Sequence, residues 1–268
     1  MNEGQASRML ISLITVCFNS VKTIDRTIQS VLTQTYKNIQ YIVIDGQSTD
    51  GTREIIESYK KNIDVIISEP DDGIYDAMNK GLGLANGRII GLLNSDDYFV
   101  HNDIIKNVVD TFMVNSVDAV HGKLIVEKSG KILRNCVSKQ NVRQLFFRGR
   151  HPHHPTIFLK KSIYDRFGNF DVRYGTAADY ELMLRLFVVK NIASFYLDEY
   201  VVIMSAGGAS QHGIKAILAA NISCLKAWDA NGIPGGIFFI SMKLLQKIVE
   251  RISALAYQKR LRLLLNKG

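Results

Sequence analysis

The sequence predicts an α/β fold in which helices flank a mostly parallel central sheet, followed by a C-terminal helical appendage. Strand and helix patterns alternate over the first hundred residues, as in βαβ units. The 268 residues are 47% hydrophobic and 22% charged, so the chain can bury a large core without disulfides or a metal. Its three cysteines lie far apart and form no CxxC pair, which excludes a disulfide scaffold and indicates a reducing, cytoplasmic compartment.

Hydrophobic spacing predicts the elements of the first half in order. Apolar, β-branched runs predict strands over 11–18, 39–44, 65–67 and 88–93. Apolar residues at intervals of three and four predict the intervening helices over 24–32, 55–59 and 74–85. Polar residues interrupt the first run and no cleavage site follows it, so we interpret it as a strand rather than a signal peptide. No stretch of 18 apolar residues occurs, and no membrane-spanning helix is expected.

The pattern changes after residue 100. A helix over 104–112 precedes a predicted hairpin of 119–126 and 131–134, turning at Ser129-Gly130. A His/Pro segment then leads to a strand over 156–159, a helix over 180–187 and two short strands between 194 and 204. The last predicted helix, over 213–228, ends near Gly232 and Pro234.

The net charge of +8 is concentrated in the tail, where seven basic residues and one acidic residue lie from Gly235 onward. The nearly neutral body argues against a nucleic-acid-binding face. In the tail, apolar residues at helical spacing adjoin Lys243, Lys247 and Arg251. A basic amphipathic helix is typical of a membrane-surface element. The alternative is a helix that packs on the domain or on a second subunit, so a homodimer stays open.

Acidic residues follow the predicted strands: Asp45 and Asp50, then Asp71, Asp72 and Asp76, then Asp96 and Asp97. Carboxyl ends of parallel strands share one edge of a sheet, where ligands bind. Each of these residues could individually be a helix cap or a turn former. The adjacent pair Asp96-Asp97 follows an apolar strand directly and suits a divalent ion that bridges phosphate oxygens. We favour a functional role for that pair.

Five stretches carry a family resemblance, in order, across about residues 10 to 210. They are ISLITVCFNS, YIVIDGQSTDGT, SEPDDGIYDAMNKGLGLANGRIIGLLNSDD, FDVRYGTAADYELMLRL and MSAGGAS. The chain resembles the inverting glycosyltransferases of family 2, which have the GT-A Rossmann-like fold. The SEPDDGIYDAMNKG form is similar to the branch that builds bacterial surface polysaccharides.

The resemblance implies roles for individual residues. Nucleotide-sugar binding is implied for Thr15, Val16, Phe18, Asn19, Asp45, Tyr75, Asp76, Lys80, Asn94, Ser95 and Asp96. Asp96 and Asp97 would hold Mn²⁺ or Mg²⁺, Asp179 would be the catalytic base, and His154 would contact the acceptor. The ring of Tyr75 could equally pack in its helix, and Asp179 could be only a helix cap.

Three positions depart from the family pattern. Gly46 stands where a second acidic residue is usual after the second strand, and Asn94 replaces the first aspartate of the DxD motif. Met78 stands where many relatives have an arginine. Lys80 or Asp76 would then serve the pocket instead. The segment His151–Pro155 has no acidic partner within it, so we interpret it as an acceptor-side loop rather than a metal site. His212 could reach the nucleotide site if the Gly207-Gly208 loop folds over it, but we favour a surface position.

The predicted function is transfer of a sugar, with inversion, from a nucleotide diphosphate sugar such as a UDP-sugar to a lipid-linked glycan. Residues 1–100 would form the donor half, 101–210 the acceptor half and 211–268 the basic helical tail, on the inner face of the cytoplasmic membrane. A non-catalytic partner that binds nucleotide sugar or membrane is the alternative. A nucleotidyltransferase lacks its phosphate loop here, and a dinucleotide oxidoreductase lacks GxGxxG.

Overall fold

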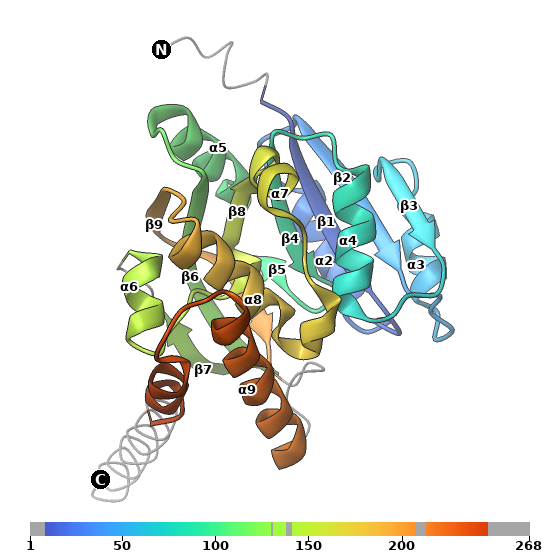
Figure 1. The fold of residues 1–268 in the computed structure, drawn as a ribbon. Helices are drawn as coiled ribbons and strands as arrows, with labels where there is room; N and C mark the ends of the chain where they lie inside the picture. The colour runs from blue at the N-terminus through green and yellow to red at the C-terminus, as the bar shows by residue number, and fades with distance from the viewer. Residues whose placement is uncertain (1–8, 130, 138–140, 207–212, 246–268) are drawn as a thin grey trace, which may run out of the picture.

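The central sheet organises the chain (Figure 1). The computed structural model describes residues 9–129, 131–137, 141–206 and 213–245. In this part of the chain a nine-stranded sheet has the order β3-β2-β1-β4-β8-β6-β9-β5, and β7 pairs with β6 outside that path. Helices cover the sheet, as predicted.

The first half is a parallel βαβ unit, which confirms the predicted alternation. Its elements are β1 (Ile11–Cys17), α2 (Ile24–Leu32), β2 (Ile39–Asp45), α3 (Thr52–Ser58), β3 (Val65–Ser68), α4 (Ile74–Leu84) and β4 (Ile89–Asn94). β1 lies between β2 and β4 and is parallel to both. β1 ends one residue before the predicted end, and Phe18 lies exposed beyond it.

The strands β1, β2 and β4 are buried on both faces, which explains their long apolar runs. Every residue of β1 is buried. Ile14 and Val16 pack into one core cluster, whereas Ile11 and Leu13 pack into the other on the opposite face. This alternation follows from the two-residue period of a strand.

The second half is mixed in strand direction. Its elements are β5 (Tyr98–Phe99), α5 (Ile104–Val114), β6 (Ala119–Lys128), β7 (Lys131–Cys136), α6 (Val142–Phe147), the 3-10 turn η1 (His154–Thr156), β8 (Ile157–Lys160), α7 (Lys161–Phe167), the 3-10 segment η2 (Val172–Ala177), α8 (Ala178–Met183), the π-helical turn η3 (Leu184–Val189) and β9 (Ser194–Ser205). β8 is antiparallel to its neighbours β4 and β6, and β9 is parallel to β6. Three of these elements, β5, α6 and α7, were not predicted.

The prediction of two short strands between 194 and 204 is wrong, because β9 is one strand of 12 residues. Its pairing with β6 shifts register on either side of Lys123. Gly122 allows the close approach there, since a Cβ at this position would lie 2.3 Å from Cγ2 of Val201. Bulges of this kind bend a strand without ending it.

Helix α9 (Gly213–Ala230) and a further helix over residues 236–245 pack against α8 and α6 (Figure 1). The indole of Trp228 is fully buried and stacks on Phe239 with ring centroids 4.8 Å apart. No helix among the described residues is long and apolar enough to cross a bilayer. His212 and the tail beyond Leu245 lie outside the described residues.

Lys243 packs on the domain. The sequence grouped Lys243 with Lys247 and Arg251 on one basic helix face and left open that this helix packs on the domain. The ammonium of Lys243 lies over the ring of Tyr180, 4.6 Å from the centroid, and 3.4 Å from Sγ of Cys224. The lysine stem can pack along apolar surface while the ammonium lies over the aromatic ring, which is a favourable cation–π geometry.

Candidate active site

The strand ends bring two of the predicted acidic segments together. Asp45, the last residue of β2, pairs in register with Cys17 at the end of β1. Asn94, the last residue of β4, pairs with Val16 on the other side of β1. Asp45 and the Asn94–Asp97 turn therefore flank the carboxyl end of the same central strand, where α/β folds bind their ligands.

Asp45 is fully buried and both of its carboxylate oxygens accept hydrogen bonds. The backbone N–H and the hydroxyl of Ser48 donate to it, and the hydroxyl of Ser68 donates at 2.6 Å. The thiol of Cys17 lies 3.6 Å away. A carboxylate has about four acceptor positions, and donors from the chain already face them. A nucleobase N–H would therefore have to replace one of these donors.

The loop after β1 is tied to the loop after β2. Asn19 has a left-handed backbone with φ of 48°. Its N–H donates to the hydroxyl of Ser48 at 2.8 Å, and its side-chain oxygen accepts from the N–H of Thr49 at 3.0 Å. The ring of Phe18 is 63% exposed beside this pair of loops, so a flat apolar surface is available to a ligand.

Thr15 and Val16 lie inside the sheet rather than in the loops. Val16 is buried in the core, and the hydroxyl of Thr15 forms a hydrogen bond of 3.1 Å with the phenol of Tyr41. Their side chains shape the floor under the loops and do not reach the surface.

The Asn94–Asp97 turn presents oxygen atoms that lack partners. The amide of Asn94 donates to Oδ2 of Asp97 at 3.1 Å, while Oδ1 of both residues is buried without a hydrogen bond. Burial raises the pKa of Asp96. Burial, followed by the charge of Asp96, raises the pKa of Asp97 well above its ordinary range. Ser95 turns away and its hydroxyl lies 2.7 Å from that of Ser20. A nearby positive charge would relieve the cost of ionising this pair.

These residues fit a hard divalent cation that shares its coordination with a substrate. Two carboxylates and the Asn94 amide oxygen are the oxygen donors that Mg²⁺ and Mn²⁺ prefer. In the described parts of the chain, no group of three or more acidic, histidine or cysteine side chains lies close enough to hold an ion by itself. The remaining ligands would have to come from water or from a diphosphate.

Arg26 of α2 lies beside this acidic pair, although sequence reasoning missed it. Its guanidinium donates to the hydroxyl of Ser205 at 3.2 Å, and that hydroxyl donates to the backbone carbonyl of Asp96 at 2.7 Å. It also stacks 4.0 Å from the ring centroid of Tyr98. The charge of Arg26 opposes the rise in the pKa of Asp96. Arg26 is far from Asp96 in the sequence, so no local sequence pattern could show that the two residues lie close together.

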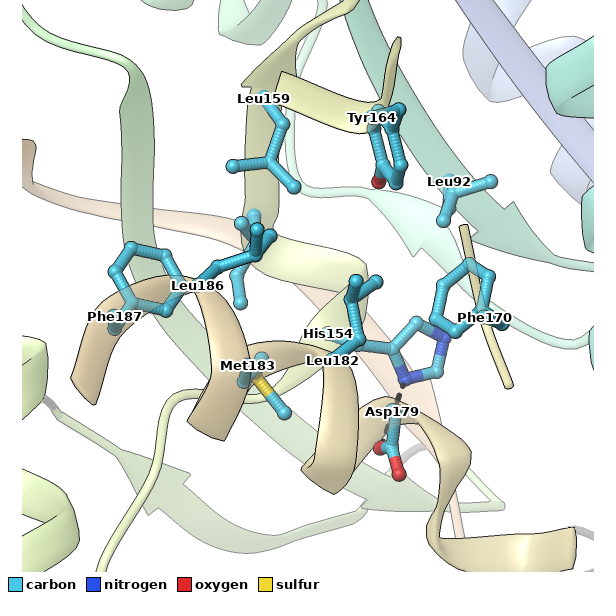
Figure 2. A pocket seen from close by; sticks show the side chains of 11 residues that line it. Leu92, His154, Leu159, Tyr164, Phe170, Asp179, Leu182, Met183, Leu186 and Phe187 are labelled. Carbon is cyan, nitrogen blue, oxygen red and sulfur yellow. Dashed lines mark ion pairs between the residues drawn. The ribbon is translucent and has the colours of Figure 1, made fainter. Parts of the chain in front are cut away.

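Asp179 lies in the first turn of α8 and its carboxylate points toward His154 (Figure 2). Nδ1 of His154 lies 3.6 Å from Oδ2 of Asp179, and the N–H of Tyr180 donates to Oδ1 at 2.7 Å. Burial alone would raise the pKa of Asp179, but His154, His151 and the Tyr180 N–H lower it to about 2. The carboxylate is therefore ionised at neutral pH and available to accept a proton.

Nε2 of His154 is buried and has no hydrogen-bond partner. His154 and Asp179 line a cavity of about 20 Å³ that is otherwise apolar, with Leu182, Met183 and Leu186 along one side (Figure 2). This volume holds about one water molecule. A larger hollow of about 620 Å³ lies by the start of β4 and the end of α5, and none of the predicted site residues lines it.

The residues of α4 divide between the two parts of the site. The ring of Tyr75 packs on Phe170, with centroids 5.3 Å apart, and burial followed by the charge of Asp179 raises its pKa well above the ordinary range. Tyr75 thus lies on the side of Asp179. Lys80 forms ion pairs with Glu69 at 2.9 Å and with Asp76 at 3.5 Å.

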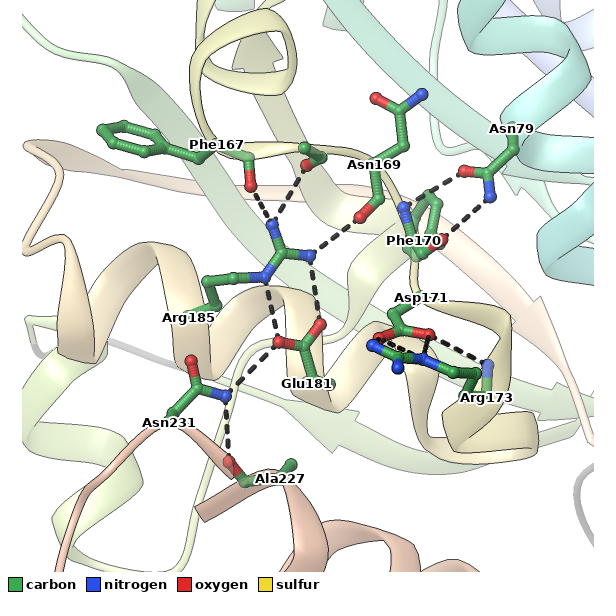
Figure 3. A network of polar contacts seen from close by, with 11 residues as sticks. Asn79, Phe167, Asn169, Phe170, Asp171, Arg173, Glu181, Arg185, Ala227 and Asn231 are labelled. Atoms are coloured by element: carbon green, nitrogen blue, oxygen red, sulfur yellow. Dashed lines mark hydrogen bonds and ion pairs between the residues drawn. The ribbon is translucent and has the colours of Figure 1, made fainter. Parts of the chain in front are cut away.

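A buried network holds the segment around Asp179 (Figure 3). Arg185 forms a two-pronged ion pair with Glu181, at 2.9 and 3.0 Å, and donates to the carbonyls of Phe167, Gly168 and Asn169. Asn231, just after α9, donates to Glu181 at 3.3 Å. These bonds fix the loop before η2 to the helix that carries Asp179.

Tyr180, the neighbour of Asp179, ties the C-terminal helices to the site. Its hydroxyl accepts a hydrogen bond of 2.8 Å from the indole of Trp228. The ring of His151 lies edge-on at 5.2 Å. Burial lowers the pKa of His153 to about 3, which keeps it neutral at pH 7. The His/Pro segment therefore lies beside Asp179, and His154 pairs with its carboxylate.

Comparison with known proteins identifies relatives over most of the chain. The model of "Glycosyl transferase family 2" matches residues 12–168. An uncharacterized glycosyltransferase of Mycobacterium tuberculosis is 33% identical over 190 residues, covering 67% of this chain and 69% of that protein. A PGL/p-HBAD biosynthesis glycosyltransferase of Mycobacterium bovis is 26% identical over 196 residues, covering 72% of this chain and 75% of that protein.

Solved structures share the fold at lower identity. TarS of S. aureus in complex with UDP-GlcNAc superposes with a TM-score of 0.63 at 17% identity, covering 81% of this chain and 67% of that chain. Against TarS in complex with UDP, this chain spans 66% of the length. The mannosyltransferase PcManGT of Pyrobaculum calidifontis, in complex with GDP-Man and Mn²⁺, gives 0.62 at 15% identity, covering 96% and 80%. The fold is thus of the GT-A type, and the chain belongs to glycosyl transferase family 2.

Proposed function

We propose that this chain transfers a sugar from a nucleoside diphosphate sugar to a hydroxyl acceptor with inversion, and that Asp179 is the general base. One observation carries the proposal: the site pushes the pKa values of two carboxyl groups in opposite directions. Asp179 is held ionised, with a pKa of about 2, whereas the pKa of Asp97 is raised well above its ordinary range. When the pKa values of two carboxyl groups shift in opposite directions, the group with the lowered pKa is the proton acceptor, and the group with the raised pKa needs a cation to be ionised.

The chemistry follows from these two environments. The acceptor oxygen attacks the anomeric carbon and loses its proton to Asp179, while the bond from that carbon to the diphosphate breaks. A single displacement inverts the configuration at the anomeric carbon. Binding an acceptor excludes water from Asp179, which raises its pKa and makes it a stronger base than in the free chain.

Mn²⁺ or Mg²⁺ is the cofactor in this proposal. Asp96 and Asp97, with the amide oxygen of Asn94, would hold the ion. When bound, it would neutralise the charge that develops on the leaving diphosphate. Two buried oxygens without partners support this assignment.

For the donor we propose a UDP-sugar bound by residues 1–100, at the carboxyl ends of β1, β2 and β4. The exposed ring of Phe18 would stack on the base beside Asn19, with Asp45 under it. Asp76 and Lys80, which form an ion pair, would contact the diphosphate. TarS in complex with UDP-GlcNAc shares this fold, as does PcManGT in complex with GDP-Man, so a UDP-sugar and a GDP-sugar are the two donors to compare.

For the acceptor we propose a lipid-linked glycan of bacterial polysaccharide synthesis, bound by residues 101–210. His154 would contact it, since its Nε2 is unpartnered next to Asp179. The relative named for PGL/p-HBAD biosynthesis supports a glycolipid-type product. Peripheral association with the inner face of the cytoplasmic membrane belongs to the same proposal.

Binding calorimetry with UDP, GDP and their sugars, with and without Mn²⁺, tests the donor proposal. We expect one nucleotide to bind in a metal-dependent manner, and Asp97→Ala to abolish the metal dependence. Asp110→Ala is the matched control, because Asp110 is a partly exposed carboxylate that pairs with Lys106 in its own helix, away from the proposed site. If well-folded protein binds no nucleotide, the proposal is wrong.

Asp179→Asn tests the second step. The variant should bind the donor normally and lose transfer to an acceptor by about a hundredfold or more. A chain that binds donor but transfers no sugar before and after this change would instead be the non-catalytic binding protein.

A further inference from the structure

The helix over residues 236–245 exposes four large apolar side chains on one side. Ile237 is 76% exposed, Phe238 62%, Leu244 39% and Leu245 61%. Pairs that are seven residues apart lie two turns along the same face of an α-helix. We call these four residues the outer face of the helix.

The opposite face of this helix is fixed against the body, so the outer face cannot turn inward. Ile240 is buried, and Phe239 packs on both Trp228 and Phe147. Lys243 lies over the ring of Tyr180 and next to Cys224. A Cβ on Gly236 would lie 2.7 Å from Cβ of Trp228, which shows how closely the two helices approach.

The chain that follows this helix is strongly basic. Residues 246–268 contain six lysine and arginine residues and one glutamate, interleaved with leucine and isoleucine. An apolar helix face that is followed in sequence by many cations matches the interface of an anionic bilayer, where acyl chains lie under negative head groups. Two copies of this chain meeting at the outer face would instead bring two such basic segments together, which like-charge repulsion opposes.

We infer that the outer face of helix 236–245 is a membrane-docking surface whose partner is the interface of a bilayer with anionic head groups. The inference rests on the exposed residues and on the basic charge of the sequence that follows them, and it does not require sugar transfer. It differs from the sequence-based expectation, because the inserted group is an apolar face of a helix docked on the body, and Lys243 points away from it.

Docking at this face would place the proposed acceptor site near the lipid surface. The inner side of the same helix contacts Tyr180, which follows Asp179 directly in α8. The Asp179 carboxylate is thus one residue away from Tyr180, whose ring contacts Lys243 of helix 236–245.

Co-sedimentation of the full chain with vesicles tests the inference. The vesicles are phosphatidylcholine alone or phosphatidylcholine mixed with phosphatidylglycerol. The test variant is Ile237→Ser/Phe238→Ser. The matched control is Ile132→Ser/Leu133→Ser on β7, two apolar residues with 62% and 57% exposure that lie outside the outer face.

We expect the unmodified chain and the control to bind the vesicles that contain phosphatidylglycerol and to bind phosphatidylcholine weakly. The outer-face variant should bind the anionic vesicles at least about tenfold more weakly, because it lacks two apolar side chains that would be buried in the bilayer. Equal binding by the outer-face variant and the control would overturn the inference. The inference would also be overturned if the unmodified chain binds neither kind of vesicle and is a dimer, and the outer-face variant is a monomer.

Two further measurements keep the outcomes distinct. Thermal unfolding of the variant should match that of the control, since all changed side chains are exposed. Nucleotide binding without vesicles should be unchanged in the outer-face variant, so a failure of membrane docking and a failure of the proposed donor site are read separately.

Discussion

Removing Arg185 should destabilise the chain strongly, because this side chain satisfies a buried carboxylate and three carbonyls at once (Figure 3). Glu181 is only 5% exposed and Arg185 16%. Breaking a buried ion pair by removing one partner costs about 3–5 kcal/mol, because an uncompensated charge is left behind. Since Arg185 retains some contact with water, we expect Arg185→Met to cost about 3 kcal/mol.

The companion change Glu181→Gln should cost less. Glutamine keeps the shape and one acceptor oxygen while it removes the charge, and we expect a loss of about 1–2 kcal/mol. The double variant leaves no buried charge unpaired, so its cost should fall below the sum of the two single costs by about 1 kcal/mol or more.

Urea unfolding followed by circular dichroism measures all four proteins, with free energies extrapolated to water. The reasoning is refuted if Arg185→Met costs less than about 1 kcal/mol, or if the two single costs add in the double variant. Either result would mean that the pair behaves as a surface ion pair.

Two further predictions concern the pKa of Asp179 and the packing of α4. In His154→Ala the pKa of Asp179 should rise from about 2 toward or above its ordinary value of 3.8, because burial is then opposed only by weaker contacts. The stabilisation from ionised Asp179 is present above its ordinary pKa and is lost as pH falls through the folded pKa. With a higher pKa the proposed base also loses its charge at a higher pH, so the acid limb of the transfer rate should move to higher pH in this variant. A pH–rate profile checks this, and an unmoved limb contradicts it. Gly81→Ala should lower stability by about 1–3 kcal/mol, since the new Cβ would lie 2.4 Å from Cγ2 of Ile14. Gly83→Ala, whose new Cβ would meet no other atom within 4 Å, should be neutral or stabilising by up to about 1 kcal/mol. Urea unfolding of both variants measures the two effects, and equal losses in both would count against this packing argument.

The first half of the fold was predictable because its central strands β1, β2 and β4 are buried on both faces. Continuous apolar runs then mark each strand, and the three-to-four spacing marks each helix, so both signals are strong. β9 was harder, because Asp198 and Glu199 interrupt its pattern. These acids do not end the strand: Asp198 pairs with Lys123 at 2.9 Å, and Glu199 accepts from His101 and Asn107. α6 and α7 are too short to show a helical period.

The candidate site was predictable in its acidic residues and hidden in their partners. Position at a strand end singles out Asp45 and Asp97 in the sequence. Ser68 and Arg26 act across space from other strands and helices, and no local pattern marks them. The inward turn of Lys243 was equally hidden, because helical spacing alone does not tell which face a neighbouring helix covers.

The absence of a side chain at Gly46 has a consequence for how this site can be altered. A Cβ there would lie 2.5 Å from Oδ2 of Asp71, so the Asp71 carboxylate occupies the space that a larger residue at position 46 would need. The φ angle of Gly46 is not positive, so alanine fits its backbone conformation. A single methyl group would therefore displace a carboxylate at the edge of the site while the core stays intact. If the proposed donor site is correct, Gly46→Ala should change nucleotide binding while leaving the stability of the fold nearly unchanged.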